Sequence, residues 1–421
     1  MKIRYHKSLA ALMALLMIGS VACKGKNQKA DEKVVEKPAE PTAEELEAKA
    51  MGIDIPTWTA YKEGVALIQQ DTPDRDAALA KFNEVLAQKP DFAAAHYNIA
   101  MIYEQQGKDE EARASLEKAR DLDPDAPEYK VAMGRVYAET DEYEKAKVLF
   151  DEVLARDASN KEAKNNLAVL ALKKGDYDTA KNYVIEIIRE DDQNVPALMT
   201  LGLIYKAQKN LSLAKYVFEK AKKIDEKNAD IHNNLGLVFM MEDNTPQAVS
   251  AFKKANSVDA SYLPSRLNLG AILIEYLDYT RANEQFDQAV KIQPDHCVAN
   301  LGFGATQYAL KAYPEAVERY EFYVSKCDEN HVSSYERLAK LHEGPLAKPA
   351  KAIEYYQKLL TLNPDEKQAT QYKAMVNFLE SQVKQQSQKP PEETAPEGGE
   401  EAPEEVTPEE EGEVVEETPE S

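Results

Sequence analysis

Small and large apolar residues recur every 34 positions through the middle of the chain. Alanine returns seven times at this spacing. A small residue lies twelve positions before each alanine, and a large apolar residue lies four positions after it. The three series are Ala112, Ala146, Ala180, Ala214, Ala248, Ala282 and Ala316; Ala100, Gly134, Ala168, Gly202, Gly236, Gly270 and Gly304; and Leu116, Phe150, Val184, Phe218, Phe252, Phe286 and Tyr320. Since residues four apart share a helix face, the pattern predicts tandem helix pairs.

Two more periods flank the seven regular ones, at about residues 57–92 and 332–366. Beyond the last period, one apolar stripe is formed by Ala369, Tyr372, Val376, Leu379 and Val383. This stripe predicts a terminal helix that covers the stacking face of the last repeat. We therefore expect an all-α array of about nine helix pairs plus a C-terminal capping helix at residues 57–386, rather than several domains.

The repeated pattern resembles the tetratricopeptide repeat (TPR), and the resemblance covers residues 57–366. The units of this family are antiparallel helix pairs. The resemblance implies a right-handed α-solenoid whose first helices line a concave surface that binds extended or helical peptide segments.

The first 22 residues have the order of an export signal. Lys2, Arg4 and Lys7 precede an apolar run at residues 9–18, and small residues follow this run. A basic start, a short apolar stretch and small residues are typical of a signal peptide, and the run is too short to span a bilayer. We therefore expect residues 1–22 to direct the protein out of the cytoplasm.

Cys23 follows a small residue, as in the bacterial lipoprotein box, although that family usually has Leu, Val or Ile where Ser20 stands. The resemblance implies that Cys23 becomes the lipidated first residue and anchors the protein to a membrane, since several acyl chains give stable anchoring. Lys24 is not the Asp that retains enterobacterial lipoproteins at the inner membrane. The resemblance therefore favours an outer-membrane lipoprotein facing the periplasm, with plain secretion and a retained anchor as alternatives.

Both ends of the mature chain differ in composition from the repeats. Residues 24–56 are rich in Lys, Glu, Ala and Pro, which predicts a lipidated, flexible tether at 23–56. Residues 387–421 contain 14 Glu, one Lys and no aromatic residue, which predicts a disordered acidic tail. The tail supplies −13 of the formal net charge of −22, so the acidity says little about what the repeats bind.

Neither charge nor motifs point to an enzyme or a nucleic-acid binder. An acidic chain lacks the basic face that phosphates require. The sequence has no Gly-rich phosphate loop, HExxH or Gly-x-Ser-x-Gly motif. The six histidines are scattered, and His96 and His232 both occupy the fourth position of a first helix, which favours a structural role. We expect no cofactor, no metal, no small-molecule substrate and no nucleic-acid partner.

Cys297 and Cys327 begin and end one helix pair, so the antiparallel arrangement brings them to the same end. A disulfide is feasible in an oxidising periplasm. Unpaired thiols are the second interpretation. His296 and His331 lie at the same end, which makes a Cys2His2 zinc site the third.

Four first helices carry Asn at the sixth position, which the sequence places at Asn98, Asn166, Asn234 and Asn268. In the TPR domain of O-linked N-acetylglucosamine transferase, Asn residues at what looks like the same position form a ladder to the ligand backbone. An amide can donate and accept at once, so it can pair with any peptide group. The resemblance implies a partner-binding role, although Asn is also a consensus residue here.

An apolar band accompanies these amides at the ninth, twelfth and thirteenth positions of the first helices. It consists of Val169, Leu172, Leu203, Leu237, Met240, Met241 and Ile274. Such a band is either helix packing or a groove for an amphipathic segment, and methionine suits adaptable contact. The Lys/Asn clamp with which other members of the family bind free carboxyl termini is not matched at the fifth positions.

We therefore predict a non-enzymatic, lipid-anchored, periplasm-facing scaffold that holds other envelope proteins in a motility, pilus or secretion machine. Its anchor, tether and repeat texture, as in residues 233–238, resemble the TPR lipoprotein of the myxobacterial adventurous gliding machinery. The alternative is a docking adaptor for enzymes of peptidoglycan synthesis or hydrolysis.

Overall fold

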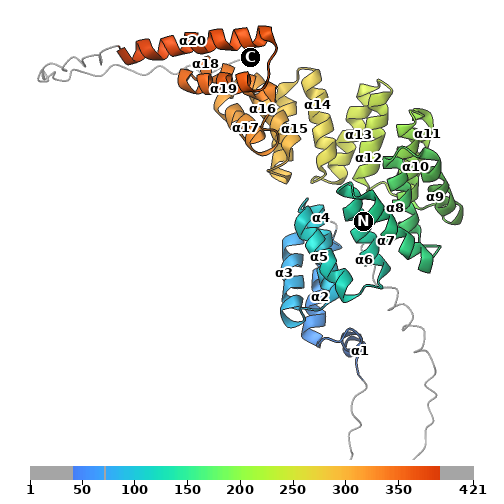
Figure 1. Cartoon of the computed structure of the whole chain (residues 1–421). Coiled ribbons are helices and arrows are strands. Elements are labelled where there is room, and N and C mark those ends of the chain that lie inside the picture. The colour runs from blue at the N-terminus through green and yellow to red at the C-terminus, as the bar shows by residue number, and fades with distance from the viewer. Residues whose placement is uncertain (1–40, 71–72, 389–421) are drawn as a thin grey trace, which may run out of the picture. The chain divides into compact units, whose positions relative to one another are not determined.

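The computed structural model describes residues 41–70 and 73–388. Within these ranges the chain forms 20 helices and no strand (Figure 1). The predicted signal peptide, the Cys23 lipidation site, the first part of the predicted tether and the predicted acidic tail from residue 389 onward lie outside the described residues. None of the described helices is both long enough and apolar enough to cross a membrane.

Nine helix pairs follow one another along the described chain. They are α2 (Ile55–Ile68) with α3 (Arg75–Gln88), α4 (Ala93–Gln105) with α5 (Asp109–Leu122), α6 (Pro127–Glu139) with α7 (Tyr143–Arg156), α8 (Lys161–Lys173) with α9 (Tyr177–Glu190), α10 (Val195–Ala207) with α11 (Leu211–Ile224), α12 (Ala229–Met241) with α13 (Thr245–Val258), α14 (Leu263–Glu275) with α15 (Tyr279–Ile292), α16 (Cys297–Ala309) with α17 (Tyr313–Lys326), and α18 (Val332–Glu343) with α19 (Pro349–Thr361). A further helix, α20 (Glu366–Gln388), packs on α19. The prediction of an all-α solenoid of nine pairs and one terminal helix is confirmed.

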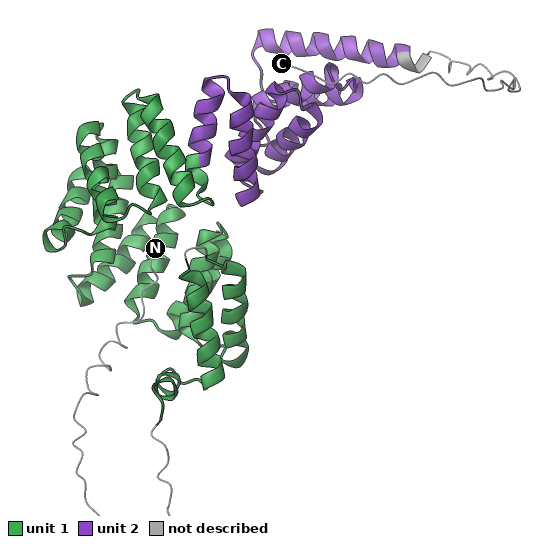
Figure 2. Ribbon diagram, turned by 180° about the vertical axis from the view of Figure 1, so that it is seen from behind, with its two compact units in different colours: residues 1–265 green, residues 266–421 purple. Residues whose placement is uncertain are grey.

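The chain divides into two compact units, residues 1–265 and 266–421, and each is described by itself (Figure 2). In the first unit the second helix of each pair, from α3 to α11, packs on the first helix of the following pair. In the second unit α15 packs on α16 and α17 packs on α18 in the same way. Each pair thus buries its apolar faces both internally and against its neighbour, as stacked repeats require.

A glycine in the first helix and a phenylalanine in the second set the spacing of most pairs. A Cβ atom added at Gly64 would lie 2.8 Å from the ring of Phe82, and one added at Gly236 would lie 2.5 Å from the ring of Phe252. Both phenylalanine rings are fully buried. Because only a residue without a side chain leaves room for the ring, the two helices approach closely at this point.

At these glycines the nearest atoms of the second helix do not belong to its alanine. The aromatic ring one turn later covers the glycine instead, because it reaches across the interface. The sizes of the two contacting residues vary together from pair to pair. Where the first helix has Ala100 or Ala168 in place of glycine, the second helix has the smaller Leu116 or Val184. The two positions together keep the volume of the interface nearly constant.

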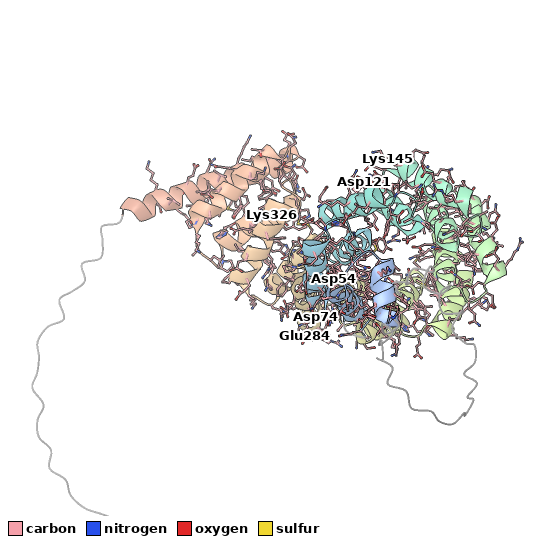
Figure 3. All side chains as sticks on the ribbon, turned by 90° about the horizontal axis from the view of Figure 1, so that it is seen from below. Asp54, Asp74, Asp121, Lys145, Glu284 and Lys326 are labelled. Carbon is pink, nitrogen blue, oxygen red and sulfur yellow. A yellow bond between two sulfur atoms is a disulfide. The ribbon has the colours of Figure 1, made fainter. Side chains whose placement is uncertain are left out.

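Short polar residues begin many of the helices. Asp54 accepts a hydrogen bond from the backbone N–H of Thr57, and Asp74 accepts one from Ala77 (both aspartates are labelled in Figure 3). Such caps satisfy donors that have no partner within the helix. They fix where each helix begins and hence the register of its inward-facing residues.

The segment before the array corrects the predicted tether at residues 23–56. Residues 43–50 form a helix, α1 (Ala43–Ala50), and α2 begins at Ile55. The Nε1 atom of Trp58 donates to Glu47 at 3.0 Å, and the Lys62 ammonium lies 2.7 Å from Glu44. Composition alone suggested a flexible segment, but its glutamates have specific partners on α2, and Ala48 is buried. The folded part therefore begins before the predicted residue 57.

Candidate partner-binding surface

Most of the predicted apolar band lies on three first helices of the first unit. Val169 and Leu172 belong to α8, Leu203 to α10, and Leu237, Met240 and Met241 to α12. All except Met241 are partly buried, and Met241 is 45% exposed. Residues of the core proper, such as Phe218, have no exposure. The band is thus less buried than the core and offers apolar surface at the ninth, twelfth and thirteenth positions.

Ile274 and Asn268 belong to α14 in the second unit, where both are partly buried. They occupy the same helix positions as their counterparts in the first unit. They are therefore candidates for a surface of the second unit.

Two of the predicted Asn residues form hydrogen bonds within their own helices; Asn166 is partly buried, and Asn234 is buried at 9% exposure. The Asn166 amide nitrogen donates to the carbonyl of Glu162 at 3.0 Å, and that of Asn234 donates to the carbonyl of Asp230 at 2.9 Å. Each bond runs one helical turn back and fixes the orientation of the amide. An amide nitrogen has two donor hydrogens, so one hydrogen of each is accounted for in this way.

Asn98 does not belong to the binding surface, and that part of the prediction was wrong. Its side chain is 2% exposed, and its amide nitrogen donates to the hydroxyl of Tyr61 at 3.0 Å. The Tyr61 ring in turn packs edge-on against Phe92. Asn98 therefore ties α4 to α2, because its repeat lies against this aromatic cluster.

An ion-pair network that the sequence reasoning missed lies on α4, α6 and α8. The Arg135 guanidinium on α6 places Nη2 3.3 Å from Glu104 and Nη1 3.1 Å from Glu162. Its side chain is only 15% exposed. Burial lowers the pKa of Arg135, but the two carboxylates outweigh burial and hold the pKa above its ordinary value. One cation thus joins three successive first helices.

Lys206 on α10 lies in a different setting within the same unit. Its ammonium donates to the Oδ1 atom of Asn234 on α12 at 2.9 Å. Among the described residues no carboxylate forms an ion pair with it. Burial alone lowers the pKa of Lys206, because a half-buried cation without a counter-ion loses hydration without compensation. Asn234 thereby uses its acceptor as well as its donor.

A signal for Lys206 was present in the sequence. It stands at the twelfth position of its first helix, where other repeats have Leu172, Met240 and Ile274. The neighbouring first helices α8 and α12 have the apolar residues Leu172 and Met240 at this position, so a lysine on α10 departs from the local hydrophobic pattern. Arg135 likewise occupies the ninth position, where α8, α10 and α12 have apolar residues.

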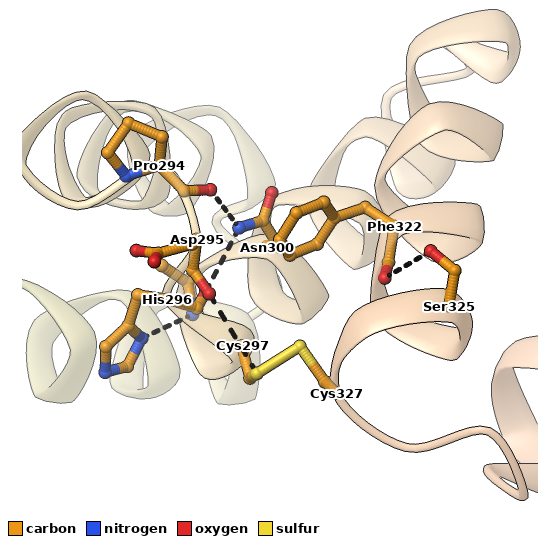
Figure 4. Close-up of a disulfide and its surroundings, with 9 residues drawn as sticks. Pro294, Asp295, His296, Cys297, Asn300, Phe322, Ser325 and Cys327 are labelled. Atoms are coloured by element: carbon orange, nitrogen blue, oxygen red, sulfur yellow. Dashed lines mark hydrogen bonds between the residues drawn. A yellow bond between two sulfur atoms is a disulfide. The ribbon is translucent and has the colours of Figure 1, made fainter. Parts of the chain in front are cut away.

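Cys297 and Cys327 form a disulfide that joins the start of α16 to the end of α17, with 5.7 Å between the Cα atoms (Figure 4). The neighbouring histidines have other partners. The His296 Nδ1 atom accepts from the backbone N–H of Ala299, and the His331 Nδ1 atom lies 2.7 Å from the Ser334 hydroxyl. The described residues contain no group of three or more His, Cys, Asp or Glu suited to a metal ion.

The fourth-position histidines have the structural role that the sequence favours. The Nε2 atom of His96 lies 2.9 Å from the carbonyl oxygen of Pro90, and that of His232 lies 2.8 Å from the carbonyl oxygen of Glu226. Both contacts reach six residues back, into the turn before the first helix. They hold this turn in place.

Family models match several segments of the chain. Models described as tetratricopeptide repeat match residues 71–136, 137–204 and 332–366, and a model described as TPR repeat matches residues 202–243. No curated protein matches the chain.

Solved structures are similar to the chain in fold. A structure of the APC/C heterotetramer Cut9–Hcn1 covers 77% of this chain and 63% of its own, with a TM-score of 0.52 and 14% identity. A structure from the functional characterisation of Pseudomonas aeruginosa PilF covers 52% of this chain and 99% of its own, with a TM-score of 0.45 and 20% identity. PilW, a type IV pilus biogenesis factor, covers 51% and 98%, with a TM-score of 0.41 and 22% identity. At these identities the likeness concerns the fold alone.

Proposed function

Because this chain is a tetratricopeptide-repeat protein, we propose that it is a non-enzymatic scaffold that holds segments of partner proteins on the first helices of its first unit. The apolar band on α8, α10 and α12 carries the proposal. A fully packed interior would bury these side chains completely. Here they are only partly buried, and Met241 is exposed. An amphipathic segment that covers this band would remove apolar surface from water, at about 25 cal/mol per Å².

We place the scaffold at the cell envelope, as an outer-membrane lipoprotein facing the periplasm in a motility, pilus or secretion machine. Support comes from the predicted export signal and the predicted lipidation site at Cys23 in the sequence. The disulfide in the second unit fits the same location, because such bonds persist in oxidising compartments.

Capture of partners from crosslinked envelopes tests the scaffold. Met241→Glu places a charge in the band at an exposed position, so it should reduce partner recovery by about tenfold without unfolding the array. Tyr216→Glu is the matched control, because Tyr216 is 70% exposed on the second helix α11. Equal recovery with both variants would contradict the proposal. Recovery of cell-wall enzymes without motility, pilus or secretion proteins would favour the peptidoglycan adaptor instead.

Fractionation tests the anchor. Cys23→Ser removes the acceptor of the lipid, so the variant should move from the membrane to the soluble fraction. Retention of the variant in the membrane fraction would refute lipidation as the tether.

A further inference from the structure

Lys206 is a partly buried cation, and no carboxylate among the described residues forms an ion pair with it. Its ammonium has three donor hydrogens, and the Oδ1 atom of Asn234 at 2.9 Å is the one acceptor that the described residues provide. Arg135 in the same unit, which is also partly buried, has two carboxylates as partners. Buried charges are ordinarily paired, so a half-buried lysine with only a neutral partner has an incomplete set of contacts.

The helix positions of Lys206 and Asn234 place them within the apolar band. Leu203 lies three residues before Lys206 on α10, and Leu237 lies three residues after Asn234 on α12. Residues three apart are neighbours on a helix face, so each polar group adjoins an apolar one. The hydrogen bond between Lys206 and Asn234 joins the two helices at this point.

We propose that Lys206 binds a carboxylate from the partner segment that occupies the apolar band. The inference rests on the proposed function and names the chemistry of its ligand. The carboxylate accepts from the Lys206 ammonium, while Asn234 holds that ammonium at the edge of the band. Apolar residues of the segment on either side of the acid contact Leu203, Leu237 and Met241.

Charge also limits how many acidic residues the partner segment can have. The tail carries −13 of the formal net charge of −22, and the −9 that remains on residues 1–386 is still negative, so these residues would repel a long run of acidic residues. One ammonium neutralises one carboxylate, and the side chains around it are apolar. The expected ligand is therefore a segment of another envelope protein with a single Asp or Glu between large apolar residues, rather than a polyacidic sequence such as the chain's own tail.

Site-specific photocrosslinking in living cells tests the proposal with the full-length protein. A benzophenone amino acid at Met241 should form crosslinks, and the same group at Tyr216 on α11 serves as the control for the opposite helix. Mass spectrometry should find an Asp or Glu within about four residues of the crosslinked position in the partner. Adding Lys206→Gln should reduce the yield about tenfold or more, because a charged pair is lost.

Lys209→Gln is the matched control for charge. It removes the same charge three residues later, at an exposed position, and should leave the yield unchanged. Lys206→Arg should restore most of the yield, because it keeps the cation.

The possible failures are distinguishable. Absence of crosslinks at Met241 would overturn the proposed function and the inference together. A crosslinked partner without a nearby carboxylate, or an unchanged yield with Lys206→Gln, would overturn the inference and leave the scaffold in place. Crosslinks to the Glu-rich residues 389–421 of the chain itself would overturn the assignment to a partner protein.

Discussion

Two stretches of the first helices in the first unit each contain a partly buried cation, and the two cations have different partners. Around α6, Arg135 is 15% exposed and lies between Glu104 and Glu162, on the helices before and after it. Around α10, Lys206 is half-buried and contacts the neutral amide of Asn234. Both stretches belong to repeats with the same glycine–phenylalanine packing, as Gly134 with Phe150 and Gly202 with Phe218 show.

Arg135 forms ion pairs within the fold, whereas Lys206 has only a neutral hydrogen-bond partner among the described residues. A guanidinium can hold two carboxylates at once, so Arg135 joins helices and satisfies its own burial. The ammonium of Lys206 has no such compensation within the described residues. The charge of Arg135 is therefore neutralised within the first stretch, whereas Lys206 in the second stretch has a neutral hydrogen-bond partner, which is the basis for proposing a carboxylate ligand.

The largest effect is expected from breaking the packing that both stretches share. Gly202→Ala would push a methyl group into the ring of Phe218 and move α10 away from α11. We expect the local free energy of unfolding to fall by about 2 kcal/mol, even though alanine favours the helix. Hydrogen exchange of α10 measured by mass spectrometry reports this quantity, because it resolves individual helices of a repeat array.

A second substitution shows whether steric overlap is the cause. Gly202→Ala combined with Phe218→Leu recreates the pair found at Ala100 and Leu116, and should recover most of the loss. If the double variant is less stable than either single variant, volume matching is not what sets the spacing of the helices.

Much of this packing was predictable from the sequence, because a repeat displays the same constraint many times. The 34-residue period gave the nine helix pairs and the terminal helix α20, and the interface residues appeared at constant positions. The nature of the contact was not predictable. Spacing along the helix shows that Gly202 and Phe218 recur together, but not that the ring covers the glycine rather than fills the space beside it.

The candidate surface was predictable only in its apolar part. Periodicity found Leu203 and Met241 because their type recurs. The polar residues depend on their partners, which lie one or two repeats away in sequence. Asn98 resembles Asn234 in position but donates to the hydroxyl of Tyr61 on α2. The sequence shows that Lys206 departs from the apolar pattern, but it does not show that no carboxylate among the described residues forms an ion pair with it.

Removing the paired cation should destabilise its stretch. Arg135→Met removes the partner of Glu104, whose side chain is 23% exposed, and of the more exposed Glu162. We expect the local free energy of unfolding around α6 to fall by about 1 to 2 kcal/mol, because the carboxylates lose their compensation. Hydrogen exchange of α4, α6 and α8 should rise together, whereas exchange confined to α6 would show that Arg135 does not join the three helices.

Removing the Lys206 cation should change the local free energy of unfolding in the opposite direction. Lys206→Met replaces the ammonium by an apolar side chain at a position where other repeats have Leu or Met. The protein without its partner should become more stable around α10 by about 0.5 kcal/mol, because the desolvation of the charge is relieved. The same variant should bind the partner less well. A loss of stability comparable to that of Arg135→Met would show that Lys206 is already compensated within the fold.

The smallest effect concerns pH and follows from the lowered pKa of Lys206. Because burial lowers this pKa in the folded state, the folded protein releases the proton at a lower pH than the unfolded chain does. The destabilising contribution is fully present below the folded pKa, and it is lost as the pH rises toward the unfolded value of about 10.4. The stability advantage of Lys206→Met over the wild type should therefore shrink as the pH is raised from 7 to about 10, as measured by thermal unfolding of both proteins. An advantage that grows over this range would mean that the pKa of Lys206 is raised, as it would be by an ion pair.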